Sequence, residues 1–214
     1  MTISNNRPEL WDYTELILSH DFQGNPFKEV ELSASFRNGD EEIRISGFFD
    51  GDSQWKIRFM PTRTGSWEFV TASNLAELDG HQGVLECQPA SEDVHGIVEV
   101  EGASRFAYSD GTPYHPIGTT CYVWNLQGEA LEQATLDSLR NSPFNKIRFC
   151  VFPKRYTFNY NEPELYPFPG EVKAKWNPED QDDYTPKPRD DWWDYDYFNS
   201  DYFQHLDDCV LQLR

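Results

Sequence analysis

The sequence has few basic residues and few cysteines. Only 18 of its 214 residues are Lys or Arg, against 37 Asp and Glu, which gives a formal net charge of −19. A surface of this sign repels phosphate groups, so we expect neither a nucleic-acid partner nor an anionic membrane surface. The cysteines contain no C-x-x-C pair, which argues against a zinc module or a small disulfide scaffold; they are Cys87, Cys121, Cys150 and Cys209.

Long apolar runs and common catalytic motifs are also lacking. The chain has no apolar run long enough to cross a membrane, and its N-terminal residues do not show the basic and then apolar pattern of a signal peptide. We therefore predict a cytoplasmic protein that does not enter a membrane. The histidines have no metal-ligand spacing, and the G-x-S-x-G, G-x-G-x-x-G and P-loop motifs are absent. We expect no metal and no cofactor.

Aromatic residues, by contrast, are abundant, at 15% of the chain. Between Val30 and Gln88, apolar and polar residues alternate in short segments that are separated by turn sequences such as Arg37-Asn38-Gly39-Asp40. A period of two indicates half-buried strands, and this spacing of turns is typical of an antiparallel β-sandwich. We predict an immunoglobulin-like β-sandwich domain over residues 1–102.

A different pattern begins after Gly102. An apolar stretch at Tyr114–Trp124 predicts a buried strand, Glu129–Asn141 has the apolar spacing of a helix, and Asn145–Phe152 predicts a second strand. This order is that of a parallel βαβ unit. A further helix is expected from Asp201 onward, so residues 103–214 are predicted to form an α/β domain.

Residues 153–200 between these elements have no sustained periodicity and are rich in Pro, Asp and aromatic residues. A loop of this length is usually functional or disordered. Its rings could form subsites for a ligand, or they could anchor the loop to the domain surface. Its many carboxylates fit a solvated loop.

Two stretches of the sequence resemble a known family. Residues 48–74 look like a hairpin region of the N-terminal β-sandwich found on a group of glycoside hydrolases. Residues 106–124, 144–148 and 199–206 resemble the opening of their apiosidase-like (β/α)8 barrel. The resemblance implies that residues 103–214 form only the first βαβα units of an incomplete barrel. It also implies that the general acid and the nucleophile lie on later strands, beyond residue 214, so that this chain contains no catalytic residue and is inactive alone.

The same resemblance suggests where a sugar would bind. Function in such barrels is concentrated at the carboxyl ends of the strands, and sugar faces pack on aromatic rings while cations donate to hydroxyl groups. Arg148 could instead pair with an acid on a missing strand, and the rings could simply cover the core. The predicted substrate-binding residues are Tyr122, Trp124, Arg148, Phe152, Lys154, Tyr156, Trp192 and Trp193.

The expected ligand is therefore a polysaccharide or oligosaccharide. A non-catalytic carbohydrate-binding or interaction module remains the alternative function. Two parallel strands with open edges are prone to association. We therefore expect an oligomer, another chain, or a missing C-terminal part to cover this edge.

Overall fold

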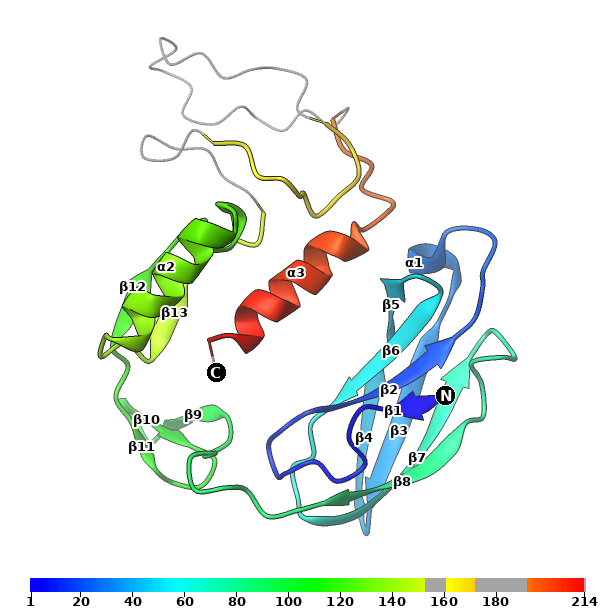
Figure 1. Cartoon of the computed structure of the whole chain (residues 1–214). Coiled ribbons are helices and arrows are strands. Elements are labelled where there is room, and N and C mark those ends of the chain that lie inside the picture. Colours follow the sequence, from blue (N-terminus) through cyan, green and yellow to red (C-terminus); the bar gives the residue numbers. More distant parts are fainter. Residues whose placement is uncertain (153–160, 172–191, 214) are drawn as a thin grey trace. The chain divides into compact units, whose positions relative to one another are not determined.

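The computed structural model describes residues 1–152, 161–171 and 192–213 (Figure 1). The chain divides into two compact units, Met1–His115 and Pro116–Arg214. This division differs from the boundary predicted at residues 102 and 103. The physical reason is that the strands after residue 103 pair with the strand before it.

The first unit contains two four-stranded antiparallel sheets, with strand orders β1-β2-β6-β5 and β4-β3-β7-β8 (Figure 1). A short helix, α1 (Pro26–Glu29), connects β2 to β3. The antiparallel β-sandwich predicted from the alternating pattern is confirmed. The strands are β1 (Thr2–Ile3), β2 (Thr14–Ser19), β3 (Leu32–Asn38), β4 (Glu41–Ser46), β5 (Phe48–Gly51), β6 (Gln54–Phe59), β7 (Gly65–Ser73) and β8 (Gln82–Cys87).

The alternation places one side of each sheet in the core. In β6, Trp55, Ile57 and Phe59 are buried, while the residues between them are half-buried. Between the sheets, the ring of Phe36 on β3 stacks on Phe59 with a centroid distance of 3.8 Å and an interplanar angle of 3°. Phe59 also meets Trp67 of β7 edge to face at 5.1 Å. These rings dominate the burial that stabilises the sandwich.

The N-terminal segment pairs with the last strand of the sandwich. The backbone N–H of Gln88 donates to the carbonyl of Pro8, and the N–H of Leu10 donates back to the carbonyl of Gln88, both at 2.8 Å. The N–H of Glu86 donates to Asn6 at 3.0 Å. The beginning and the end of the sandwich sequence are therefore joined directly.

A three-stranded antiparallel sheet follows, formed by β9 (Val98–Glu101), β10 (Arg105–Tyr108) and β11 (Pro113–Tyr114). The buried strand predicted over residues 114–124 was wrong in extent. Pro116 interrupts the stretch, because proline has no N–H to donate to a ladder. The stretch is divided into β11, β12 (Gly118–Thr120) and the 3-10 helix η1 (Trp124–Leu126).

The second unit has the predicted strand, helix and strand order. β12 pairs in parallel with β13 (Lys146–Arg148), and α2 (Glu129–Arg140) lies between them in sequence. The prediction that β12 is buried was wrong. Gly118 and Thr120 are exposed, because among the described residues β13 is the single strand that pairs with β12. The predicted C-terminal helix is confirmed as α3 (Ser200–Leu211).

A small core holds the second unit together. Trp124, Leu136 of α2 and Cys209 of α3 are buried in contact with one another, and partly buried side chains surround them. This core joins η1, α2 and α3. Within the described residues, no helix has the length and apolar character needed to cross a membrane.

Candidate functional site

The carboxyl ends of β12 and β13 lie side by side. Thr120 is the register partner of Arg148, and two further hydrogen bonds continue the pairing. The N–H of Cys121 donates to the carbonyl of Arg148 at 2.9 Å, and the N–H of Cys150 donates to the carbonyl of Tyr122 at 2.8 Å. Parallel pairing thus brings together side chains that are distant in the sequence.

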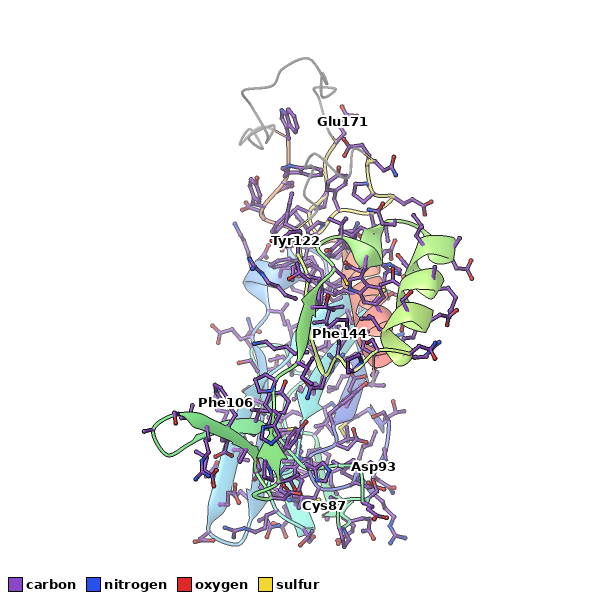
Figure 2. All side chains as sticks on the ribbon, turned by 90° about the vertical axis from the view of Figure 1, so that its left-hand side faces the viewer. Cys87, Asp93, Phe106, Tyr122, Phe144 and Glu171 are labelled. Atoms are coloured by element: carbon purple, nitrogen blue, oxygen red, sulfur yellow. The ribbon has the colours of Figure 1, made fainter. Side chains whose placement is uncertain are left out.

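Arg148 and Tyr122 meet at this end of the strands. The guanidinium carbon of Arg148 lies 5.5 Å from the centroid of the Tyr122 ring, which is a cation–π geometry. Figure 2 shows Tyr122 at this end and Phe144 at the opposite end of the strand pair. Arg148 is exposed and Tyr122 is half-buried. The pair therefore offers a ring and several N–H donors to a ligand.

Trp124 has a different environment. Only 4% of its surface is exposed, and its ring meets Phe149 edge to face at 6.3 Å. Its indole N–H has no hydrogen-bond partner among the described residues. The adjacent Asn125 is completely buried, and both polar atoms of its amide also lack partners within this part of the chain. Sequence reasoning did not identify Asn125, although an Asn in an apolar run is a visible signal.

Phe152 belongs to an aromatic cluster with three rings of the loop. Its ring is 5.8 Å from that of Trp193 and 6.2 Å from that of Tyr166, and Tyr166 and Trp193 are 4.4 Å apart. Phe168 extends the cluster, 6.3 Å from Phe152. Trp192 and Trp193 are each only 6% exposed. Tyr166 and Phe168 belong to the aromatic-rich stretch at residues 153–200 but were not among the predicted binding residues.

Backbone contacts hold the two described parts of this loop together. The N–H of Glu171 donates to Trp192 at 3.2 Å, and that of Asp194 donates to Pro169 at 2.8 Å. Gly170 forms a bridge with Trp193 at a φ of 146°, and an added Cβ would lie 2.1 Å from the carbonyl oxygen of Trp192. This geometry requires glycine. Two predicted residues, Lys154 and Tyr156, lie outside the described residues.

Burial affects the ionisable groups beneath this site. Desolvation, with smaller contributions from Cys150 and Cys209, raises the pKa of Tyr202 to about 12, and its hydroxyl donates to the carbonyl of Val151. Burial also raises the pKa of Cys121, and burial with nearby carboxylates raises that of Cys209 to about 11. At neutral pH both thiols are protonated, so neither is an activated nucleophile.

One group of side chains among the described residues could hold a metal ion. The ligating atoms of Glu132, His205 and Cys209 all lie within 4.8 Å of one another. No metal site was predicted, because the histidines show no metal-ligand spacing along the sequence. His205 and Cys209 are one helical turn apart, which is the signal that could have indicated two of the three ligands.

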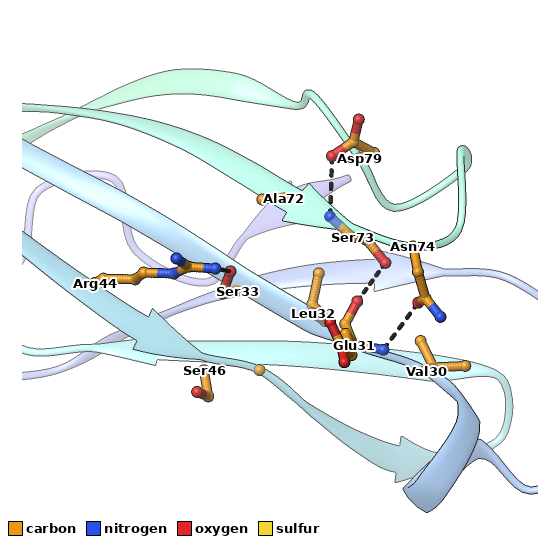
Figure 3. Close-up of a pocket in the computed structure, with 11 residues that line it drawn as sticks. Val30, Glu31, Leu32, Ser33, Arg44, Ser46, Ala72, Ser73, Asn74 and Asp79 are labelled. Carbon is orange, nitrogen blue, oxygen red and sulfur yellow. Dashed lines mark hydrogen bonds between the residues drawn. The ribbon is translucent and has the colours of Figure 1, made fainter.

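A separate cavity of about 670 Å³ lies on the second sheet of the sandwich (Figure 3). In its wall, Arg44 donates to the hydroxyl of Ser33 at 3.1 Å. The Ser73 N–H donates to the Asp79 carboxylate at 2.9 Å, and the Ser73 hydroxyl donates to the carbonyl of Glu31 at 2.6 Å. None of the described residues that line this cavity is aromatic, so they offer no stacking surface for a sugar.

Together, the folds of the two units define a β-sandwich followed by a parallel β-α-β unit. Residues 7–74 match a domain of unknown function, DUF5060. The chain is also similar to the crystal structure of a putative glycoside hydrolase from Bacteroides vulgatus ATCC 8482, with 40% sequence identity and a TM-score of 0.85. The similarity covers 97% of this chain but 39% of that chain, so this chain spans about two fifths of its relative. A comparison with curated proteins gave no match.

Proposed function

We propose that this chain is the N-terminal part of a glycoside hydrolase that acts on a polysaccharide or its oligosaccharides. In this proposal the sandwich, which we assign to the immunoglobulin-like type, precedes the first βαβα units of a (β/α)8 barrel. The observation that supports it most strongly is the similarity to the Bacteroides vulgatus protein over 97% of this chain at 40% identity. The parallel pair β12 and β13, connected through α2, is the arrangement with which such a barrel begins.

The proposed sugar-binding surface lies at the carboxyl ends of β12 and β13. Tyr122 offers a ring on which the C–H face of a sugar can pack, and Arg148 offers donors for hydroxyl or carboxylate groups. Phe152 brings the aromatic cluster to the same strand end. We assign Trp192 and Trp193 mainly to anchoring the loop, because both are buried among other rings.

Arg148 has two possible partners in this proposal. It can bind the substrate directly, or it can pair with a carboxylate on a later strand of the barrel. Both roles need an exposed guanidinium group at the strand end, as is found here. Exchange for lysine perturbs both roles, because a lysine retains the charge but loses the two-pronged geometry.

Catalysis by a glycoside hydrolase requires two carboxyl groups across the scissile bond, about 5–5.5 Å apart for retention and further apart for inversion. We propose that both belong to later strands, beyond residue 214. The chain alone then binds sugar without cleaving it.

The test combines hydrolysis and binding. Release of reducing ends from a panel of plant and microbial polysaccharides is measured for this chain and for the protein encoded by the continued reading frame. We expect turnover only from the longer protein, and binding of the same glycan by both. Turnover by this chain alone would disprove the placement of the carboxylates. Binding without turnover by a longer protein would favour the non-catalytic carbohydrate-binding module.

A further inference from the structure

Three potential metal ligands come together where α2 and α3 pack. His205 and Cys209 lie one turn apart on α3, and Glu132 lies on α2. The Nε2 atom of His205 is 3.1 Å from Oε1 of Glu132 and 3.5 Å from Sγ of Cys209. These atoms come from two helices whose packing is fixed by the core of the second unit.

Two of the three separations among these ligand atoms fit the edges of a tetrahedral coordination shell, and the third, between Glu132 and Cys209, lies within 4.8 Å. Zinc lies about 2.0–2.1 Å from histidine nitrogen, about 2.0–2.2 Å from carboxylate oxygen and about 2.3 Å from thiolate sulfur. In a tetrahedron, these bond lengths separate nitrogen from oxygen by about 3.3 Å and nitrogen from sulfur by about 3.5 Å. The two separations in the structure, 3.1 and 3.5 Å, differ from those values by at most a few tenths of an ångström.

A second oxygen faces the same nitrogen. The backbone carbonyl oxygen of Asn125 lies 2.9 Å from Nε2 of His205. This nitrogen carries at most one hydrogen, yet it faces a carbonyl, a carboxylate and a sulfur. Without an ion, this one hydrogen must serve both the carbonyl and the carboxylate. A cation at the centre would satisfy all of them at once.

The charge and accessibility of the group also suit a cation. The side chain of Glu132 is only 14% exposed, and among the described residues its ion-pair partner is His205. The side chain of His205 is 34% exposed, which leaves a path from solvent. Cys209 is 2% exposed and closes the inner side.

We propose that Glu132, His205 and Cys209 form a binding site for a divalent transition-metal ion, with Zn²⁺ as the best match. Imidazole, thiolate and carboxylate are together the ligands that this ion accepts in a tetrahedral site. On binding, the thiol of Cys209 releases its proton to solvent and the ring hydrogen of His205 moves to Nδ1. The ion would cross-link α2, α3 and the segment after β12. This structural role is independent of the proposed sugar binding.

Cobalt provides a spectroscopic test on the full chain. The protein is treated with a chelator, freed of it by gel filtration and titrated with Co²⁺ alone. We expect one equivalent to produce a thiolate-to-cobalt charge-transfer band in the near ultraviolet and intense visible bands typical of tetrahedral Co²⁺. Zn²⁺ should displace the bound Co²⁺. The midpoint temperature of thermal unfolding should rise as the concentration of free metal rises.

Matched variants locate the site. Cys209→Ser should abolish the charge-transfer band, and His205→Gln and Glu132→Gln should each weaken Co²⁺ binding at least tenfold. Cys150→Ser, a cysteine outside the group, should leave the spectrum unchanged. Circular dichroism verifies that each variant is folded, and Glu132→Gln serves as the test if a variant in α3 does not fold. A titration without the charge-transfer band, or one unchanged in a folded Glu132→Gln variant, would overturn the proposal.

Discussion

The guanidinium group of Arg148 lies over the ring of Tyr122, 5.5 Å from its centroid. The parallel register causes this contact, because Thr120 is paired with Arg148 and Tyr122 follows two residues later. The contact holds a flexible cation at a defined place on the strand end. If the proposed sugar surface is correct, this pair is its centre.

Arg148→Ala should therefore weaken oligosaccharide binding by about tenfold or more, since one charge-assisted hydrogen bond contributes about 1.5–3 kcal/mol. Isothermal titration calorimetry with the best glycan from the panel measures the change. Arg148→Lys should recover part of the affinity if the charge matters, and little if two-pronged donation matters. Arg140→Ala, at another exposed arginine of the same unit, is the control and should bind as the unchanged chain does. Equal affinities for all four proteins would refute this surface.

The stacked rings of the sandwich give a stability prediction. Phe36 is completely buried against Phe59. Phe36→Ala should lower the free energy of unfolding by about 3–5 kcal/mol, because it removes this contact and leaves a cavity. Phe106→Ala provides the matched control, since Phe106 is 45% exposed and should contribute little. Urea unfolding followed by circular dichroism compares them, and similar midpoints would contradict the assigned core.

The pH dependence of stability should reveal the cation at Lys56. Its ammonium group lies 2.5 Å from Asp50 and 3.8 Å from Glu15. Burial alone would lower the pKa of Lys56, but the hydrogen bond to Asp50 and the charges of Glu15 and Asp50 outweigh it and raise the pKa above 10.5. The resulting stabilisation is complete below pH 10.5 and is lost as the pH rises through the folded-state pKa.

Lys56→Met should accordingly cost about 2 kcal/mol at pH 8, because it leaves two largely buried carboxylates with less compensation. The difference from the unchanged chain should shrink above pH 10.5. Arg37→Met removes one member of an exposed ion pair with Glu42 and should cost less than about 1 kcal/mol at any pH. A penalty for Lys56→Met that stays constant up to pH 12 would argue against this role.

Gly170 gives a local test of the loop anchor. Gly170→Ala places a methyl group against the Trp192 carbonyl at a φ that disfavours L-residues. We expect loss of near-ultraviolet circular dichroism from the loop rings, with little change in the far-ultraviolet signal. Gly118→Ala is the control, since its added Cβ would meet no atom closer than 3.5 Å. Retention of the aromatic signal by Gly170→Ala would show that the bridge to Trp193 is dispensable.

We predict that the exposed apolar surface of the second unit causes this chain to associate. A cavity of about 340 Å³ opens between α2, β13 and the end of α3, and apolar side chains line part of it. Several apolar residues of this unit are more than 40% exposed, including Leu131, Phe144, Val151 and Val210. We expect this chain to form oligomers in light scattering and to bind a dye for exposed apolar surface. A compact monomer without dye binding would contradict the expected need for a covering partner.

The sandwich could be predicted because most of its strands show an alternating apolar pattern within their own sequence. Alternation at Trp55, Ile57 and Phe59 specifies both the strand and its buried face. β2 was harder to recognise, since Thr14, Glu15 and Leu16 are buried in succession and break the alternation. Such a strand is recognisable only from its partners in the folded sheet.

The candidate sites also differ in whether the sequence alone could predict them. The meeting of Tyr122 and Arg148 follows from a general rule for parallel strands, so the sequence could predict it. Glu132 and His205 are separated by 73 positions, and their contact depends on how two helices pack. No periodicity in either helix indicates that distance. Side-chain groups formed by helix packing are therefore accessible only from the structure.

The backbone pairing of residues 6–10 with residues 86–88 has a consequence for synthesis. A ribosome releases the N-terminal segment first, and this segment has no partner there until Gln88 has left the exit tunnel. Residues 6–10 must therefore wait for nearly the entire sandwich sequence, whereas β1 can pair early with β2. Once they pair, the sandwich can be complete before most residues of the second unit have emerged from the ribosome, so the first unit can fold while the second is still being synthesised.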